Sequence, residues 1–381
     1  MVFTLTLTQA QNIIFMMADQ LRFDALSYAR TDNSSAFYTP SLDRIKSEGL
    51  SISHSYSSTP TCTPARAALL TGQSPWNHGM IGYGKIAPRY KFSFPKVLSD
   101  SNLWLTASIG KDHFGWNDTS NQGISHGYQT TTLYDGLGSF DSTKPHDHVG
   151  EFDDYDQWFE SVMPGKDPQA TMDGFDGSGW NSWNGAPFVY DEYYHPTAWV
   201  GRRAVEFINK YVNATKNGIP TKPFLLKISF HRPHSPYDPP KRILDAITKE
   251  SLPKLHECQA VTKSNPYPGA NDSGHGNAWS LRFRGNSTLG DPVGCGPTKE
   301  SGGGPDAWCG KMNPSNQTLA RRAYAGSVRF VDEQIGHIYQ TLKSTSLLDN
   351  TWIIFTADHG DGQGDHYHWR KGFPCKNDFH C

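Results

Sequence analysis

The sequence predicts an α/β fold, a doubly wound and mostly parallel sheet flanked by helices. Four short apolar runs rich in β-branched and aromatic residues are typical of buried strands, and they cover residues 12–18, 103–109, 224–230 and 351–356. Segments with helical spacing of apolar residues lie between them, at residues 41–48, 65–70, 197–211 and 318–342. This alternation of strands and helices favours a parallel sheet with helices on its faces.

The chain has 381 residues, so we expect one enzyme-sized domain over residues 1–381. Two loop-rich regions interrupt the alternation, residues 131–194 and 252–313, and we interpret both as insertions around the sheet. A formal net charge of -2 offers no broad electrostatic attraction to nucleic acid or to an anionic membrane. The longest apolar run, residues 13–18, is far shorter than the roughly 20 residues that a membrane-spanning helix needs.

Signals for the cellular compartment are mixed. The N-terminal segment has no basic residue before its apolar part, so it is a poor signal peptide. Acceptor sequons for N-glycosylation occur at Asn33, Asn117, Asn213, Asn271, Asn286 and Asn316, twice the roughly three expected by chance. The pairs Cys295 with Cys309 and Cys375 with Cys381 are close enough in sequence to close small disulfide loops. We therefore expect a secreted protein or one in the lumen of the secretory pathway.

Polar residues capable of chemistry follow each of the four predicted strands at once. They are Asp19 and Gln20, residues 111–113, residues 231–234, and Asp358 with His359. In open parallel sheets the ligand site lies beyond the carboxyl ends of the strands. We therefore expect these four segments to converge on one crevice.

Cys62 precedes Pro64, a residue suited to the first position of a helix, so the cysteine is expected at a helix N-terminus. Backbone N–H groups and the helix dipole favour negative charge there, and Arg66, one turn further on, can point to the same place. A cysteine-thiolate phosphatase needs a longer loop between its cysteine and arginine, which excludes that class. A lone cysteine is usually a small buried apolar residue, so the neighbouring motifs decide its interpretation.

Those motifs resemble the sulfatase family. Cys62-x-Pro-x-Arg66 followed by Ala-Ala-Leu-Leu-Thr-Gly resembles the family signature in which the cysteine is oxidised to formylglycine. Further motifs follow in the family's order: Asp19-Gln20, Gly-Lys-x-His at 110–113, Pro-His-x-Pro at 233–236, Asp358-His359-Gly, and the loop at 364–372 that contains Lys371. The resemblance extends from residue 12 to residue 372.

The resemblance implies an alkaline-phosphatase-like fold and a sulfuric ester hydrolase matured by a formylglycine-generating enzyme. The implied catalytic residues are Cys62, Arg66, Lys111, His113, His234 and Lys371. Hydrated formylglycine would attack sulfur, Lys111, Lys371 and His234 would bind the sulfate and leaving oxygens, and His113 would remove the second hydroxyl's proton. His54, His78, His126 and His231 lack this support, and we interpret them as structural.

The implied metal ligands are Asp19, Gln20, Asp358 and His359. They offer mostly hard oxygen atoms, so the expected cofactor is one divalent cation, Ca²⁺ first, with Mg²⁺ or Mn²⁺ as alternatives. The substrate would be a small-molecule or carbohydrate sulfate ester. The aromatic residues of 155–194 would suit stacking on sugar rings, and they would equally suit core packing.

Two departures from the family pattern leave alternatives open. Many sulfatases have two acids where this chain has Asp19-Gln20, and the arrangement found here is similar to that of phosphonate monoester and phosphodiester hydrolases of the superfamily. The chain also reaches Cys381 soon after Lys371, whereas relatives continue with a further strand and a smaller C-terminal domain. We therefore expect the C-terminal subdomain to be missing, and a truncated, inactive homologue that binds metal is a third hypothesis.

Overall fold

The computed structural model describes residues 11–32, 34–81, 90–114, 125–136, 153–172, 185–255, 307–309, 313–365 and 368–372. The two predicted disulfides depend on side chains outside this description. The predicted insertion at 131–194 is described in part and includes a strand and a helix. Most of the insertion at 252–313 lies outside it.

A five-stranded parallel sheet with the order β3-β2-β4-β1-β6 forms the centre of the fold. Its strands are β1 (Asn12–Asp19), β2 (Leu105–Gly110), β3 (Thr130–Leu133), β4 (Phe224–Pro233) and β6 (Thr351–Ala357). Four of them are the predicted strands, with β2 beginning two residues later than expected. The predicted α/β fold with a parallel sheet is confirmed.

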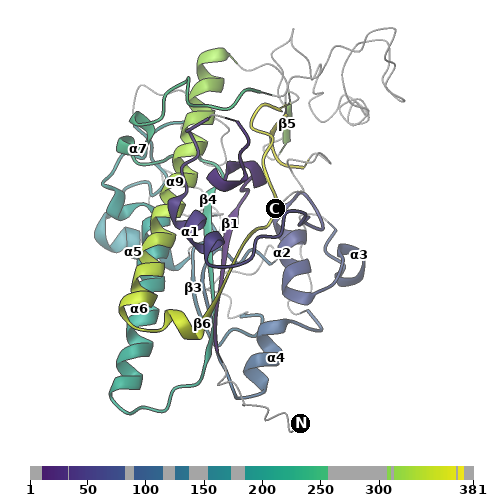
Figure 1. The fold of residues 1–381 in the computed structure, drawn as a ribbon, viewed down its shortest axis with the longest axis vertical. Helices are drawn as coiled ribbons and strands as arrows, with labels where there is room; N and C mark the ends of the chain where they lie inside the picture. Colours follow the sequence, from purple (N-terminus) through teal and green to yellow (C-terminus); the bar gives the residue numbers. More distant parts are fainter. Residues whose placement is uncertain are drawn as a thin grey trace.

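Helices cover both faces of this sheet, with α6, α9 and α1 on one side and α2 and α4 on the other (Figure 1). The α-helices are α1 (Pro40–Ser47), α2 (Cys62–Thr71), α3 (Pro75–His78), α4 (Phe94–Asp100), α5 (Asp154–Val162), α6 (Pro196–Lys216), α7 (Lys241–Asp245) and α9 (Pro314–Ser344). Short 3₁₀ turns occur at Phe23–Ala25, Ser27–Ala29, Glu192–Tyr194 and Leu348–Asn350. The described helices include none that is both long and apolar enough to cross a membrane.

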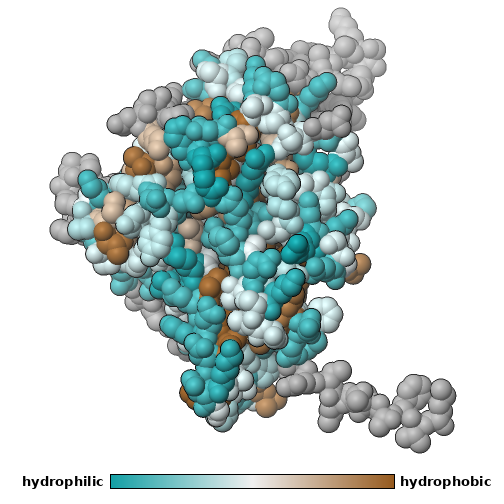
Figure 2. Space-filling view, turned by 60° about the vertical axis from the view of Figure 1, so that its left-hand side comes forward, coloured by the Kyte–Doolittle hydropathy of each residue, from teal (hydrophilic) through white to brown (hydrophobic). Residues whose placement is uncertain are grey.

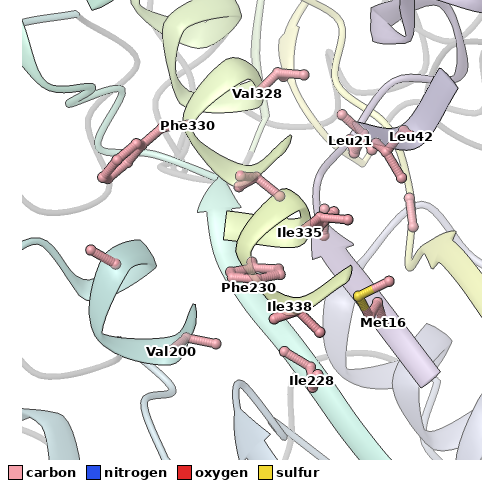
Figure 3. Packing of buried hydrophobic residues seen from close by; sticks show 14 of the residues in the cluster. Met16, Leu21, Leu42, Val200, Ile228, Phe230, Val328, Phe330, Ile335 and Ile338 are labelled. Atoms are coloured by element: carbon pink, nitrogen blue, oxygen red, sulfur yellow. The ribbon is translucent and has the colours of Figure 1, made fainter. Parts of the chain in front are cut away.

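The main core lies between the sheet and the helices α6 and α9. Figure 3 shows Met16 of β1 and Ile228 and Phe230 of β4 packed near Ile335 and Ile338 of α9. All five side chains are almost completely buried. Figure 2 shows one outer face, on which apolar residues are interspersed among hydrophilic ones.

The other face of β4 combines apolar packing with polar residues. Leu225 packs there with Leu70 of α2 and Phe114, in a second and smaller cluster. Because side chains alternate along a strand, Lys227 and Ser229 lie on the same face as Leu225. This alternation places two buried polar side chains of the central strand beneath α2, whose first residue is Cys62.

A small antiparallel pair completes the described structure. It joins β5 (Ala307–Cys309) to β7 (His368–Arg370). Lys371 follows β7 directly, and the backbone N–H of Gly372 donates to the carbonyl oxygen of Pro60 at 3.1 Å. The end of β7 therefore lies beside the segment that leads into α2.

Candidate active site

The carboxyl ends of four sheet strands meet at one buried centre. Lys111, after β2, donates from Nζ to Oδ2 of Asp19 at 2.5 Å, at the end of β1. The backbone N–H of His234, after β4, donates to the carbonyl oxygen of Asp19 at 3.1 Å. Gln20 donates from its backbone N–H to Oδ1 of Asp358, after β6, at 3.0 Å. The structure thus brings together the four polar segments that the sequence places after strands.

Cys62 is the first residue of α2 and is completely buried. Its Sγ accepts from Nζ of Lys371 at 2.8 Å and lies 3.2 Å from Nε2 of His359. The expectation that Pro64 occupies the first helical position is wrong, because the helix begins two residues earlier and Pro64 is its third residue. Proline is tolerated there because the first turn has unpaired N–H groups in any case.

The surroundings of Cys62 stabilise negative charge. Burial and the carboxylate of Asp19 each raise the pKa of the thiol. The cationic groups of Lys371, Lys111 and His359 outweigh them and hold that pKa at about 6. A thiol at this position is therefore placed to react as a thiolate.

The predicted metal ligands form a compact donor set. Atoms of Asp19, Asp358 and His359 lie within 4.8 Å of one another and of the Cys62 sulfur. Within the described part of the chain, Oδ1 of Asp19 and Oε1 of Gln20 are buried and accept no hydrogen bond. Buried oxygens without donors are costly unless a cation is bound. Three carboxylate or amide oxygens with one imidazole therefore fit a hard divalent cation.

Arg66 links the predicted metal ligands to the strands of the sheet through hydrogen bonds and ion pairs. Its side chain is completely buried, and Nε donates to Oδ2 of Asp358 at 2.7 Å. Nη1 donates to the carbonyl oxygen of Lys111 at 3.0 Å and to Oγ of Ser229 at 2.9 Å. Nη2 lies 4.0 Å from Oδ2 of Asp19. Arg66 therefore neutralises the buried carboxylates and holds three strand ends together.

The loop that carries Lys111 and His113 begins at a glycine that no other residue could replace easily. Gly110 has a φ of +89°, and a Cβ there would lie 2.0 Å from the carbonyl oxygen of Ser229. Nε2 of His113 lies 3.0 Å from Oγ1 of Thr63, next to Cys62. Burial and then the charge of Lys111 lower the pKa of His113 well below its ordinary value. His113 is therefore a neutral imidazole beside residue 62.

Three further residues fix this loop. Asp135 accepts from the backbone N–H of Asp112 at 2.6 Å and from that of His113 at 3.2 Å. Nζ of Lys227 donates to Oδ1 of Asp112 and to the carbonyl oxygen of Lys111, both at 2.6 Å. The sequence predicted the segment that contains Asp112, at residues 111–113, but neither Asp135 nor Lys227. A lysine inside the apolar run of β4 was the available signal for Lys227.

Lys371 joins the nucleophile position to His234. Nδ1 of His234 lies 2.7 Å from the carbonyl oxygen of Ser235, which can only accept, so this nitrogen carries a proton. Nε2 is left to accept from Nζ of Lys371 at 2.9 Å. Burial and the charge of Lys371 lower the pKa of His234 well below its ordinary value. The pair thus holds one transferable proton beside Cys62.

His231 lies closer to this centre than its structural interpretation suggested. Its ring centroid is 4.6 Å from that of His234, and one of its nitrogens is within 4.8 Å of ligand atoms of Asp19 and His234. Nη1 of Arg232 lies 2.7 Å from Nδ1 of His231, and a guanidinium can only donate. Nδ1 therefore accepts, and the proton sits on Nε2, a buried donor without a partner among the described residues.

The other three histidines left as structural lie apart from these contacts. His78 and His126 pack against the ring of Tyr90, and His54 is exposed. The described aromatic residues of 155–194 pack mainly with each other and with Trp199. Tyr155 and Phe159 are almost completely buried, so core packing accounts for them.

Known proteins with similar sequences match nearly the whole length of this chain. The family model described as Sulfatase matches residues 11–380. The arylsulfatase of Clostridium perfringens is 31% identical over 95% of this chain and 66% of its own length. The choline-sulfatase of Rhizobium meliloti is 24% identical over 96% of this chain and 60% of its own length. The chain thus spans less than two thirds of the length of these relatives.

The fold also matches a solved structure, the phosphonate monoester hydrolase of Agrobacterium radiobacter. The TM-score is 0.67 at 21% identity, covering 97% of this chain and 66% of that one. At this identity the likeness shows a shared fold alone. The match to the family model over residues 11–380 and the 31% identity to an arylsulfatase show that the chain belongs to the sulfatase family.

Proposed function

We propose that the protein hydrolyses sulfate esters, using residue 62 after its oxidation to formylglycine. One observation carries the proposal. The completely buried Cys62 starts a helix, and its Sγ lies 2.8 Å from Nζ of Lys371 and 3.2 Å from Nε2 of His359. A cysteine kept only for packing has no need of a buried ammonium group within hydrogen-bond distance of its sulfur. The proposed metal ligands are Asp19, Gln20, Asp358 and His359.

Two groups absent from the polypeptide as synthesised would supply the hardest chemistry. Hydrated formylglycine has two hydroxyls on one carbon, one to attack sulfur and the other to drive the release of sulfate. A divalent cation polarises a sulfate oxygen as a Lewis acid.

The chain itself supplies the binding site for an anion. Lys111 and Lys371 present two buried ammonium groups near residue 62, which is the first residue of α2. These charges act in a site from which water is largely excluded, where electrostatic attraction is stronger than in bulk water. The expected ligand is the anionic group of the ester.

Two protons have to move during hydrolysis, and the structure offers a separate carrier for each. The His234–Lys371 pair holds a proton that can pass to the leaving oxygen, which makes the alcohol a better leaving group. His113 is neutral, and its Nε2 lies 3.0 Å from Oγ1 of Thr63, the residue after position 62. It is suited to accept the proton of the second hydroxyl.

A small-molecule or carbohydrate sulfate ester remains the proposed substrate, and a formylglycine-generating enzyme the proposed maturation partner. Two curated relatives are named as an arylsulfatase and a choline-sulfatase, which supports sulfate monoesters without naming the alcohol. The proposed location is outside the cell or in the secretory lumen. Asn213, one of the predicted glycosylation sites, is exposed on α6.

Gln20 supports a second candidate, the hydrolysis of phosphonate monoesters or phosphodiesters. An amide in place of a second acid makes the donor set less negative, which changes the charge that the substrate meets. Aryl sulfate, aryl phosphonate monoester and aryl phosphodiester should therefore be assayed in parallel on matured protein. Our proposal expects the highest kcat/KM for the sulfate. A higher value for either phosphorus ester would contradict it, and cation binding without any turnover would favour the truncated, inactive homologue.

A further inference from the structure

Asp361 is a completely buried carboxylate three residues after Asp358. Its Oδ1 accepts from the backbone N–H groups of Gln363 at 2.8 Å and Arg370 at 3.1 Å. Its Oδ2 accepts from the hydroxyl of Tyr237 at 2.8 Å and from Nε2 of Gln20. Two donors thus reach each oxygen. Donors therefore surround both oxygens of this carboxylate, and each oxygen acts as an acceptor.

This arrangement has a consequence for the amide of Gln20. The oxygen and nitrogen of a glutamine amide have nearly the same shape, so hydrogen-bond partners decide which way the group faces. Both oxygens of Asp361 accept hydrogen bonds, and the NH₂ group of Gln20 faces Oδ2. Oε1 then faces the opposite way, where it is buried and accepts no hydrogen bond from any described residue.

The backbone of Gln20 is fixed independently of its side chain. Its N–H donates to Oδ1 of Asp358 at 3.0 Å, and its carbonyl oxygen accepts from the hydroxyl of Tyr324 at 2.8 Å. Its φ is +64°, in the left-handed region. With the backbone held, the side-chain torsions, including rotation of the terminal amide, determine how the group faces its surroundings. That freedom decides whether position 20 offers an oxygen or an NH₂ group.

We propose that Asp361 is a positioning residue that selects the amide orientation of Gln20 and thereby makes position 20 a neutral oxygen ligand for the cation. The proposal rests on the metal site of the proposed function. It also couples two positions. A carboxylate at position 361 requires a hydrogen-bond donor at position 20. A hydrogen-bond donor at position 361 would instead be compatible with a carboxylate at position 20.

The first variant is Asp361→Asn, tested by titrating metal-stripped protein with Ca²⁺ in a calorimeter. The asparagine can present its own NH₂ group to Gln20, which would turn Oε1 away from the cation site. Loss of such a supporting hydrogen bond is expected to weaken Ca²⁺ binding by about 10- to 100-fold. Tyr237→Phe is the matched control, because it removes a donor from the same Oδ2 and leaves the amide of Gln20 in place. Its Ca²⁺ affinity should stay within about threefold of the wild type.

The double variant Gln20→Glu with Asp361→Asn supplies the decisive comparison. The introduced glutamate can accept from the introduced asparagine with one oxygen and offer the other to the cation, so Ca²⁺ affinity should return to the wild-type value or exceed it. Gln20→Glu alone sets two carboxylates against each other and should bind Ca²⁺ at least about tenfold more weakly than the double variant. This comparison does not require Asp361→Asn alone to fold.

Two outcomes would overturn the proposed role of Asp361 while leaving the cation site intact. One is a Ca²⁺ affinity of Asp361→Asn equal to that of the wild type. The other is a double variant that binds no more tightly than Gln20→Glu. A wild-type protein that binds no divalent cation would instead contradict the metal site of the proposed function, and the role of Asp361 with it.

Discussion

The buried pair Arg232–Asp238 should carry a large share of the stability of the segment after β4. Nε of Arg232 donates to Oδ1 of Asp238 at 2.5 Å, and Nη2 donates to Oδ2 at 2.6 Å. Both side chains are at most 1% exposed. Asp238→Asn keeps the size of the side chain but removes its charge, so a buried guanidinium would lose its counter-ion.

Two estimates bound the cost of this substitution. Burial raises the pKa of Asp238, but Arg232 lowers it from an ordinary value of 3.8 to about 2. At about 1.4 kcal/mol per unit, this difference corresponds to about 2 kcal/mol of unfolding free energy. Removing one partner of a buried ion pair typically costs about 3 to 5 kcal/mol, because the other charge stays buried. We therefore expect Asp238→Asn to lower the free energy of unfolding by about 2 to 5 kcal/mol at pH 7.

The sign of the pH dependence follows from the direction of the pKa shift. A carboxyl whose pKa is lowered in the folded state contributes stability above its unfolded pKa. That contribution of Asp238 should be complete above about pH 4 and should disappear as the pH falls towards 2. The difference between the wild type and Asp238→Asn should shrink over the same range.

Urea denaturation followed by tryptophan fluorescence measures the effect. Glu333→Gln is the matched control, since Glu333 also pairs with an arginine, Arg242, at 2.6 Å, but 40% of its side chain is exposed. Exposed pairs contribute roughly 0 to 1 kcal/mol. If Asp238→Asn is no more destabilising than Glu333→Gln at pH 7, the reasoning about the buried pair is wrong.

Three further substitutions test the chemistry by activity. Cys62→Ala should abolish turnover while leaving the urea midpoint nearly unchanged, and substantial remaining kcat would exclude residue 62 as the nucleophile. His113→Ala should release about one equivalent of alcohol per site in a rapid-mix assay and then stop, because the second proton transfer is lost. His234→Ala should slow that first release itself, so equal loss of the burst in both variants would contradict the separate roles of the two histidines.

The central strands could be predicted from the sequence because they are buried on both faces. β4, for example, is buried at all ten positions, and five of its first seven residues are apolar. Three strands lacked such a signal. β3 reads Thr-Thr-Thr-Leu, and β5 and β7 have three residues each, too short for any periodicity.

Some residues of the candidate site could likewise be predicted from the sequence, and others could not. Residues directly after predicted strands were found because the topology of a parallel sheet brings strand ends together. Asp361, Asp135 and Lys227 were missed, because each acts through a partner far away in the chain. The contact between Gln20 and Asp361, for example, spans 341 positions. Only the folded chain shows which acid faces which donor.

The central claim, that residue 62 is a formylglycine, is tested most directly by peptide mass. Trypsin should release residues 47–66 as one peptide, since Lys46 precedes it, Arg66 ends it and no basic residue recognised by trypsin lies between them. The protein should be produced together with a formylglycine-generating enzyme, with Cys62→Ala as the unmodified reference. Conversion of the thiol to an aldehyde predicts a peptide lighter by about 18 Da than the unmodified sequence. An active protein whose peptide keeps the full mass of cysteine would contradict the account.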